Sequence, residues 1–282
     1  MAGYYHLSVK IIGRGTGRSA VACAAYRSGQ ALHDERYGAF HDYSAKGGIV
    51  RTGIIAPAGA PAWAHDRERL WNEVERAEKR KDAQLAREIE LGLPHGLGVE
   101  RHTALIEEFA REQLLGRGLV VDYAIHAPNR KGSRMNDHAH LMITMRGIGP
   151  EGLTGGKDRS LNSREQLGAW RAAWADIQNR EYERAGLRDA DGQILRVDHR
   201  SFESQGSDRE PTIHMGVFAT ALERQGVRTE VGDLNREIQK SNEERERFHL
   251  AAALFQRDEV RLLLEQEEGF RRGRDERDPF NP

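Results

Sequence analysis

The chain has 282 residues and carries 43 lysines and arginines against 44 aspartates and glutamates, so its net charge is close to zero. Any nucleic-acid site must therefore be a local patch and not a field of the whole molecule. The single cysteine excludes an internal disulfide and suits the reducing cytoplasm. No stretch reads as a membrane segment or a secretory signal, so we expect a soluble, cytoplasmic protein.

The first predicted elements are a strand and a helix. Apolar and polar residues alternate over residues 4–12, which predicts a half-buried strand. Ser19 is a suitable N-cap for a helix of small residues that ends at Gly29. Residues 31–62 contain many turn-forming residues and indicate loops with one short strand.

A helix, a second strand and a further helix follow. Residues 66–84 show a helical period with many charges, and residues 85–93 alternate as a strand does. This strand places Glu88 and Glu90 on one face. Residues 99–115 read as an amphipathic helix that ends at glycines.

Two more strands enclose a short basic loop. The first strand, at 119–128, ends near His126, and the second, at 138–145, starts with His138 and His140 on one face. The loop NRKGSRMND between them is short, so the two strands are expected to form an antiparallel hairpin.

The remaining sequence is mainly helical. A helix at 163–185 carries tryptophans, helical periodicity returns from 217 to 269, and residues 271–282 are expected to be disordered. We therefore predict an α+β domain over residues 1–215, with a central antiparallel sheet flanked by helices, and a helical C-terminal extension over 216–282.

Three histidines can meet on one face of the predicted hairpin, because His138 and His140 share a strand face and His126 ends the partner strand. Imidazole is a common ligand of divalent metals, and three such ligands leave coordination positions open for water or substrate. The alternative is a group of solvated histidines that binds no metal.

The two glutamates suggest a polar neighbour inside the domain. Glu88 or Glu90 could accept a hydrogen bond from a metal-bound histidine, or a proton from a nucleophile. Ordinary exposed glutamates on an edge strand are the alternative, and the sequence does not choose between the two residues.

Tyr26 is the candidate nucleophile. It lies late in the alanine-rich helix among basic residues, and nearby cations or a metal would favour its phenolate. A tyrosinate that attacks a phosphodiester forms a phosphotyrosine and conserves the bond energy for rejoining. A packing tyrosine is the other interpretation. The basic residues that could hold the flanking DNA backbone are Lys10, Arg14, Arg18, Arg27, Arg130, Lys131 and Arg134.

Several blocks of the sequence resemble the MobA/MobL family (MobQ type) of plasmid-mobilisation relaxases, which includes the N-terminal domains of TraA-type conjugative proteins. The blocks include YYHLSVKIIGRGTGRSAVACAAYRSG, DYAIH, NDHAHLMITMR and VDHRSFESQG. They occur in the order of the family and extend from about residue 3 to residue 215.

The resemblance implies an HUH endonuclease fold in which Tyr26 is the nucleophile and the three histidines bind Mg²⁺ or Mn²⁺. It places an acidic residue, Glu88 or Glu90, near the site. Such relaxases nick one strand of plasmid DNA at a transfer origin through a 5′-phosphotyrosyl intermediate. The expected partners are single-stranded origin DNA, relaxosome accessory proteins and the coupling protein of a type IV secretion system.

Alternatives stay open at this point. A metal-dependent nuclease could activate water with the same histidines, a rolling-circle replication initiator has a related fold, and a binding protein could keep the scaffold without cleavage. Many relatives carry a helicase or primase after this domain, so the chain is either a short relaxase or part of a longer protein. The rival tyrosines are Tyr4, Tyr5, Tyr37 and Tyr43.

Overall fold

The computed structural model describes residues 3–128 and 136–275. The chain divides into two compact units, Met1–His199 and Arg200–Pro282, and the candidate site lies in the first. The predicted domain boundary after residue 215 stays a prediction.

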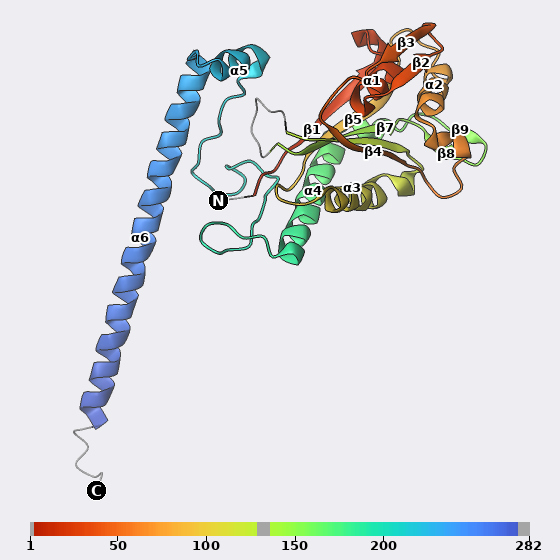
Figure 1. The fold of residues 1–282 in the computed structure, drawn as a ribbon. Coiled ribbons are helices and arrows are strands. Elements are labelled where there is room, and N and C mark those ends of the chain that lie inside the picture. The colour runs from red at the N-terminus through yellow and green to blue at the C-terminus, as the bar shows by residue number, and fades with distance from the viewer. Residues whose placement is uncertain (1–2, 129–135, 276–282) are drawn as a thin grey trace. The chain divides into compact units, whose positions relative to one another are not determined.

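Five antiparallel strands form the central sheet of the first unit, in the order β1–β5–β7–β6–β4 (Figure 1). Strand β5 therefore lies inside the sheet, whereas β1 and β4 form its edges. The strands β6 and β7 pair directly, with His126 opposite His138, which confirms the predicted hairpin. The bounds are Leu7–Gly13 for β1, Ile49–Ile55 for β4, Gln84–Gly92 for β5, Val121–His126 for β6 and His138–Thr144 for β7.

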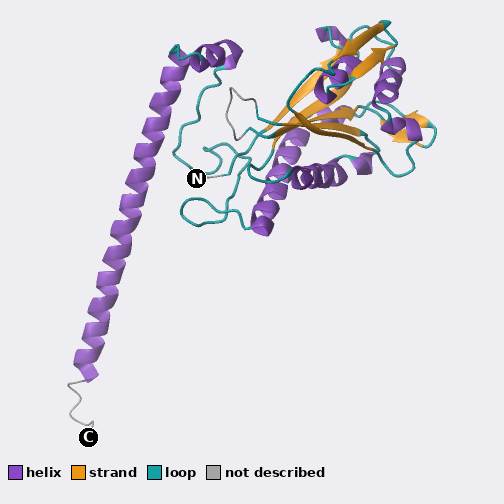
Figure 2. Cartoon of the chain, viewed as in Figure 1, coloured by secondary structure: helices purple, strands orange, loops and turns teal. Residues whose placement is uncertain are grey.

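Helices cover both faces of the sheet, with α1 and α2 on one face and α3 and α4 on the other (Figures 1 and 2). Each face has its own apolar core; the core under α3 and α4 contains the fully buried Phe109, Trp170 and Trp174. The predicted fold class, α+β with a central antiparallel sheet flanked by helices, is confirmed. The helix bounds are Ala20–Ser28 for α1, Arg67–Ala77 for α2, Val99–Gln113 for α3 and Arg164–Ala185 for α4.

Shorter elements connect these parts. The strands β2 and β3 form a separate hairpin after α1, and β8 and β9 form another after β7. Their bounds are Ala31–Asp34, Ala39–Asp42, Gly147–Gly149 and Gly152–Thr154, and the short 3-10 helices span Arg14–Thr16, Ala62–His65, Leu115–Arg117 and Arg159–Asn162.

Local chemistry explains where α1 begins and ends. The Ser19 side chain accepts a hydrogen bond from the Ala22 amide at 3.2 Å, as an N-cap does. The helix stops at Gly29, which has a φ of 64°. A Cβ at Gly29 would lie 2.3 Å from Cδ1 of Ile49, so a larger residue would have to displace the end of that side chain and adopt a left-handed conformation that favours glycine.

Two predictions for the first unit are wrong in extent. The helix expected over residues 66–84 ends at Ala77, where the chain turns toward β5; there the Glu78 carbonyl accepts a hydrogen bond from Arg14. Residues 31–62 hold three strands and not one. The short strand expected in GIIAP, residues 53–57, overlaps β4, which pairs with β6. The additional strands are β2 and β3, which pair with each other within a segment whose many turn-forming residues indicated loops.

The second unit contains α5, Gly216–Arg224, and α6, Glu230–Asp275. The helical pattern expected from 217 to 269 is interrupted between them, where Gly226 has a φ of 80°. The expected disorder from residue 271 is wrong as far as Asp275, which still belongs to α6, and residues 276–282 lie outside the described part. Among the described residues, no helix is both long and apolar enough to cross a membrane.

Candidate metal and nucleophile site

The hairpin of β6 and β7 brings three imidazoles together. The ring centroids of His126, His138 and His140 lie 5.0–5.4 Å apart. One nitrogen from each ring lies within 4.8 Å of the others, close enough for a single ion to contact all three. The juxtaposition predicted for these histidines is therefore present in the fold.

Each imidazole has one nitrogen in a hydrogen bond to a protein oxygen. His126 donates from Nε2 to the Arg27 carbonyl at 2.8 Å, and His138 donates from Nδ1 to the Asn136 carbonyl at 2.9 Å. His140 donates from Nδ1 to Glu88 Oε1 at 3.0 Å. These acceptors fix the tautomers and leave one lone pair per ring, so the donor set fits a divalent cation.

Glu88 is the buried acid of the site. It is 1% exposed, and Oε1 accepts hydrogen bonds from His140 and from Nε of Arg27, the latter at 2.5 Å. Burial acts to raise the pKa of Glu88, but the hydrogen bonds from His140 and Arg27 outweigh it and lower the pKa to about 2. Glu88 is therefore an anion that orients a candidate ligand, and not a group ready to accept a proton at neutral pH.

Glu90 lies on the same face but in wetter surroundings. Its side chain is 25% exposed and accepts a hydrogen bond from Lys10 at 3.1 Å. Nε2 of His6, at the border of the site, lies 4.0 Å from Oε1 of Glu90. Burial acts to raise the pKa of Glu90, but the Lys10 ammonium keeps it below its usual value. The structure thus separates two glutamates that the sequence could not distinguish.

The environment keeps His126 neutral. Burial lowers the pKa of His126 to about 4, although the hydrogen bond with the Arg27 carbonyl acts to raise it, and the Lys46 ammonium adds a smaller lowering effect. A neutral imidazole is the form that binds a metal, so His126 is ready to act as a ligand without first losing a proton.

Tyr26 lies on the helix end that meets the histidines. Its neighbour Arg27 contacts the site twice, through the carbonyl that accepts from His126 and the guanidinium that binds Glu88. The Tyr26 side chain is 50% exposed, which suits a nucleophile and not a packing residue. Among the rival tyrosines, Tyr5 donates its hydroxyl to the Arg171 carbonyl at 2.9 Å.

Two side chains contact the Tyr26 ring: Lys46, which the sequence did not single out, and Tyr43, which it offered only as a rival nucleophile. Lys46 Nζ lies 3.6 Å from the centroid of the Tyr26 ring, and the Tyr43 ring meets Tyr26 edge to face at a centroid distance of 5.2 Å. Both residues follow β3 in a turn-rich segment, and no local pattern distinguishes them from surface loop residues.

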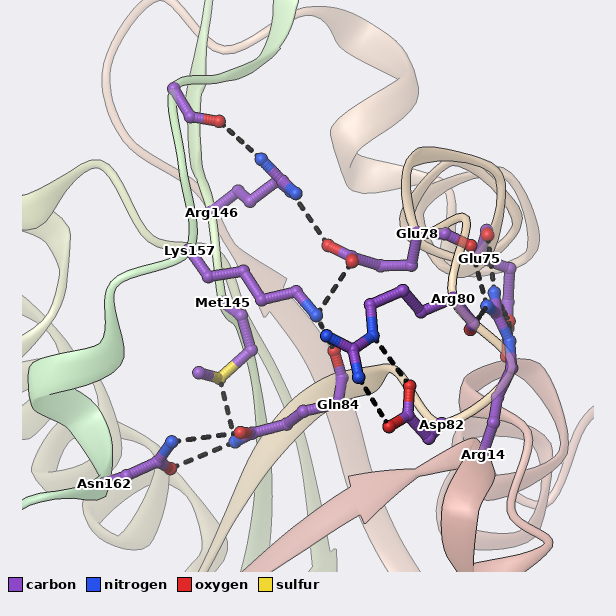
Figure 3. A network of polar contacts seen from close by, with 11 residues as sticks. Arg14, Glu75, Glu78, Arg80, Asp82, Gln84, Met145, Arg146, Lys157 and Asn162 are labelled. Atoms are coloured by element: carbon purple, nitrogen blue, oxygen red, sulfur yellow. Dashed lines mark hydrogen bonds and ion pairs between the residues drawn. The ribbon is translucent and has the colours of Figure 1, made fainter.

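The basic residues predicted to bind DNA have different environments. Arg14 is buried, and its guanidinium donates to the Glu75 carboxylate and to backbone carbonyls of α2 and the following turn (Figure 3). A buried, fully paired guanidinium cannot reach a phosphate, so the prediction for Arg14 is wrong. Arg27 is likewise engaged with Glu88 and acts inside the site.

Two predicted DNA contacts remain on the surface. Lys10 is 52% exposed beside Glu90, and Arg18 is exposed just before α1. The predictions for Arg130, Lys131 and Arg134 fall on residues outside the described part of the chain.

Comparison with known proteins gives this geometry a context. Residues 18–225 match the MobA/MobL family. The chain belongs to the MobA/MobL family. It is 37% identical over 276 residues to the conjugal transfer protein TraA of Agrobacterium fabrum strain C58. The aligned region covers 85% of this chain and 24% of TraA. The chain is 38% identical to the mobilization protein MobL of Acidithiobacillus ferridurans, over 78% of this chain and 64% of MobL.

A solved structure from work on the molecular basis of vancomycin resistance transfer in Staphylococcus aureus has a similar fold. Its TM-score to this chain is 0.60 at 33% identity, over 70% of this chain and 98% of the other. The chain spans less than two thirds of the length of the curated relatives named above. The resemblance seen in the sequence blocks is thus confirmed as family membership.

Proposed function

We propose that this chain is a DNA relaxase that nicks one strand of a plasmid transfer origin with Tyr26 and holds the 5′ end as a phosphotyrosine. The observation that carries the proposal is the connection through Arg27, which links the helix of an exposed tyrosine to Glu88 and to the histidine cluster. Membership in a family with mobilization proteins supports the same activity.

The histidines and Glu88 have different roles in the proposed reaction. His126, His138 and His140 would hold a divalent cation, Mg²⁺ or Mn²⁺, which when bound neutralises charge on the non-bridging oxygens of the scissile phosphate. Glu88 orients His140 and balances Arg27.

The covalent step exchanges one phosphoester bond for another. The Tyr26 hydroxyl oxygen bonds to phosphorus, the bond from phosphorus to the 3′ oxygen breaks, and the departing oxygen takes up a proton. Because Tyr26 is half exposed, its phenol can release its own proton to solvent. The reverse attack by a 3′ hydroxyl rejoins the strand and frees the tyrosine.

We also propose the binding surface and the partners. Lys10 and Arg18 are the described exposed cations that we assign to the DNA backbone, and Arg130, Lys131 and Arg134 are assigned on sequence alone. The partners would be single-stranded origin DNA, relaxosome accessory proteins and a type IV coupling protein, and the activity would take place in the cytoplasm. We assign this activity to residues 1–215 and treat residues 216–282 as a helical extension.

The experiment uses a pool of single-stranded oligonucleotides tiled over the DNA that flanks the gene. The chain is incubated with the pool and Mg²⁺ or Mn²⁺ and run on a denaturing gel, and the DNA that stays with the protein is sequenced. We expect Tyr26→Phe to abolish the adduct and to retain single-strand binding. Adducts that persist in this variant would refute the assignment of Tyr26.

The same gel tests a hydrolytic nuclease that uses the histidines to activate water. Such an enzyme produces nicked ends free of protein, and Tyr26→Phe leaves its rate unchanged. A binding protein without catalysis produces neither adducts nor nicks, with or without added metal.

A further inference from the structure

A single turn places two side chains, Tyr43 and Lys46, against the Tyr26 ring. After β3 the chain reverses at Tyr43–Lys46, where the Lys46 amide donates to the Tyr43 carbonyl at 2.9 Å. The Asp42 carboxylate accepts from the Ser44 amide at 2.9 Å and stabilises the turn. The Tyr43 amide donates to the Gln30 carbonyl at 3.3 Å, which fixes the turn just beyond the end of α1.

The turn holds the Tyr26 ring from two sides. Lys46 Nζ lies 3.6 Å above the ring centroid and donates to the Tyr26 carbonyl at 2.7 Å, so the ammonium is fixed relative to both backbone and ring. The Tyr43 ring stands at 89° to the Tyr26 ring. Tyr26 is 50% exposed, so these contacts position the ring and leave its hydroxyl oxygen accessible.

A cation in this place affects the reacting state more than the resting state. An ammonium over an aromatic face is attracted by the electron density of the ring. When the phenol oxygen gives up its proton, part of its negative charge spreads into the ring, and the attraction to the ammonium grows. An interaction that strengthens on the way to the transition state increases the rate and not only the affinity.

We propose that Lys46 is a positioning residue for Tyr26, which holds the phenol ring at the site and stabilises the charge that develops on it during attack. This inference rests on the proposed function of Tyr26 as the nucleophile. It adds to that function a residue from a separate turn, about twenty positions along the chain from Tyr26.

The test compares Lys46→Met with Lys46→Arg and uses Lys79→Met as a matched control. Lys79 is an exposed lysine just before the start of β5. His138 and His140 belong to β7 and pair with the opposite end of β5, at Gly92 and Glu90. The probe is the oligonucleotide that the wild-type chain captures from the tiled pool. Single-turnover adduct formation gives the rate, and fluorescence anisotropy with the metal chelated gives the Kd without cleavage.

We expect Lys46→Met to slow adduct formation about tenfold or more and to keep the Kd within about twofold. Lys46→Arg should recover most of the rate, because a guanidinium also stacks on an aromatic face. Lys79→Met should match the wild type.

Three results would overturn the role of Lys46: a wild-type rate in Lys46→Met, equal losses in Lys46→Met and Lys46→Arg, or a weaker Kd at an unchanged rate. The last result would make Lys46 a DNA contact. These outcomes differ from failure of the proposed function. If the wild-type chain forms no adduct, or if Tyr26→Phe still forms one, the nucleophile assignment fails and the role of Lys46 fails with it.

Discussion

Alanine at Glu88 and alanine at Glu90 should have very different effects, although the two residues share one face of β5. Glu88 is 1% exposed and is bound by Arg27 and His140. The Glu90 side chain is 25% exposed, and its partner Lys10 is 52% exposed. Removal of Glu88 leaves a largely buried guanidinium without a counter-charge, whereas removal of Glu90 frees a lysine that water can solvate.

The magnitudes follow from burial. Loss of one partner of a buried ion pair costs about 3–5 kcal/mol of unfolding free energy, so we expect Glu88→Ala to lie in this range. Loss of an exposed pair costs about 0–1 kcal/mol, which is the expectation for Glu90→Ala. Because Glu88 also orients His140, Glu88→Ala should lower the affinity for Mn²⁺ by roughly 10–100-fold.

Urea unfolding and calorimetric titration with Mn²⁺ measure these two effects separately. Glu88→Gln serves as the conservative control, since it keeps the shape and one carbonyl acceptor. Adding Arg27→Met to Glu88→Ala should recover part of the lost stability, because the unpaired charge is then gone. Equal destabilisation by Glu88→Ala and Glu90→Ala, or an unchanged Mn²⁺ affinity in Glu88→Ala, would refute the reasoning.

The remaining predictions concern the histidines and the basic residues. His138→Ala should reduce Mn²⁺ affinity at least about tenfold in the same titration, since it removes a ligand. Burial lowers the pKa of His126 from 6.5 to about 4, so His126 becomes protonated at a higher pH in the unfolded chain than in the folded chain. Stability should therefore fall as the pH decreases from about 6.5 toward 4, and less steeply in His126→Gln, as urea midpoints at several pH values would show. Arg14→Met should cost about 3–5 kcal/mol of unfolding free energy, since it leaves Glu75 buried and unpaired, with DNA affinity unchanged. Arg18→Ala should keep the urea midpoint but reduce the salt dependence of DNA binding by about one charge.

Each of these predictions has a contradicting result. Full Mn²⁺ affinity in His138→Ala would mean that the cluster does not hold the ion. An identical pH profile in His126→Gln would remove burial of that imidazole as the cause. Normal stability in Arg14→Met, or a strong loss of DNA affinity, would contradict its structural role, and an unchanged salt dependence in Arg18→Ala would place Arg18 outside the DNA surface.

The sequence was sufficient where the physics is local. Alternation predicted the strands that carry the glutamates and the histidines, and Ser19 and Gly29 predicted both ends of α1 through the geometry of a capped helix. The short loop between β6 and β7 implied a hairpin, and a hairpin is enough to bring His126 opposite His138. These features depend on neighbours in sequence or on one turn.

Contacts between distant segments needed the tertiary structure. Strand β5 became an inner strand only because β1 and β7 pair with it, and that placement buries Glu88 against Arg27 while Glu90 stays near solvent. The same long-range packing buried Arg14 on α2, where composition alone suggested a phosphate contact.

The sequence by itself therefore determined the chemistry that is present: a tyrosine on a capped helix, three histidines on a hairpin, and the family to which they belong. Only the tertiary structure decided which glutamate is hydrogen-bonded to a histidine of the cluster, which cations remain exposed, and that Lys46 lies over the Tyr26 ring. The physical reason is that alternation and capping act over a few residues. Burial and ion pairing, in contrast, depend on which segments meet once the sheet has formed.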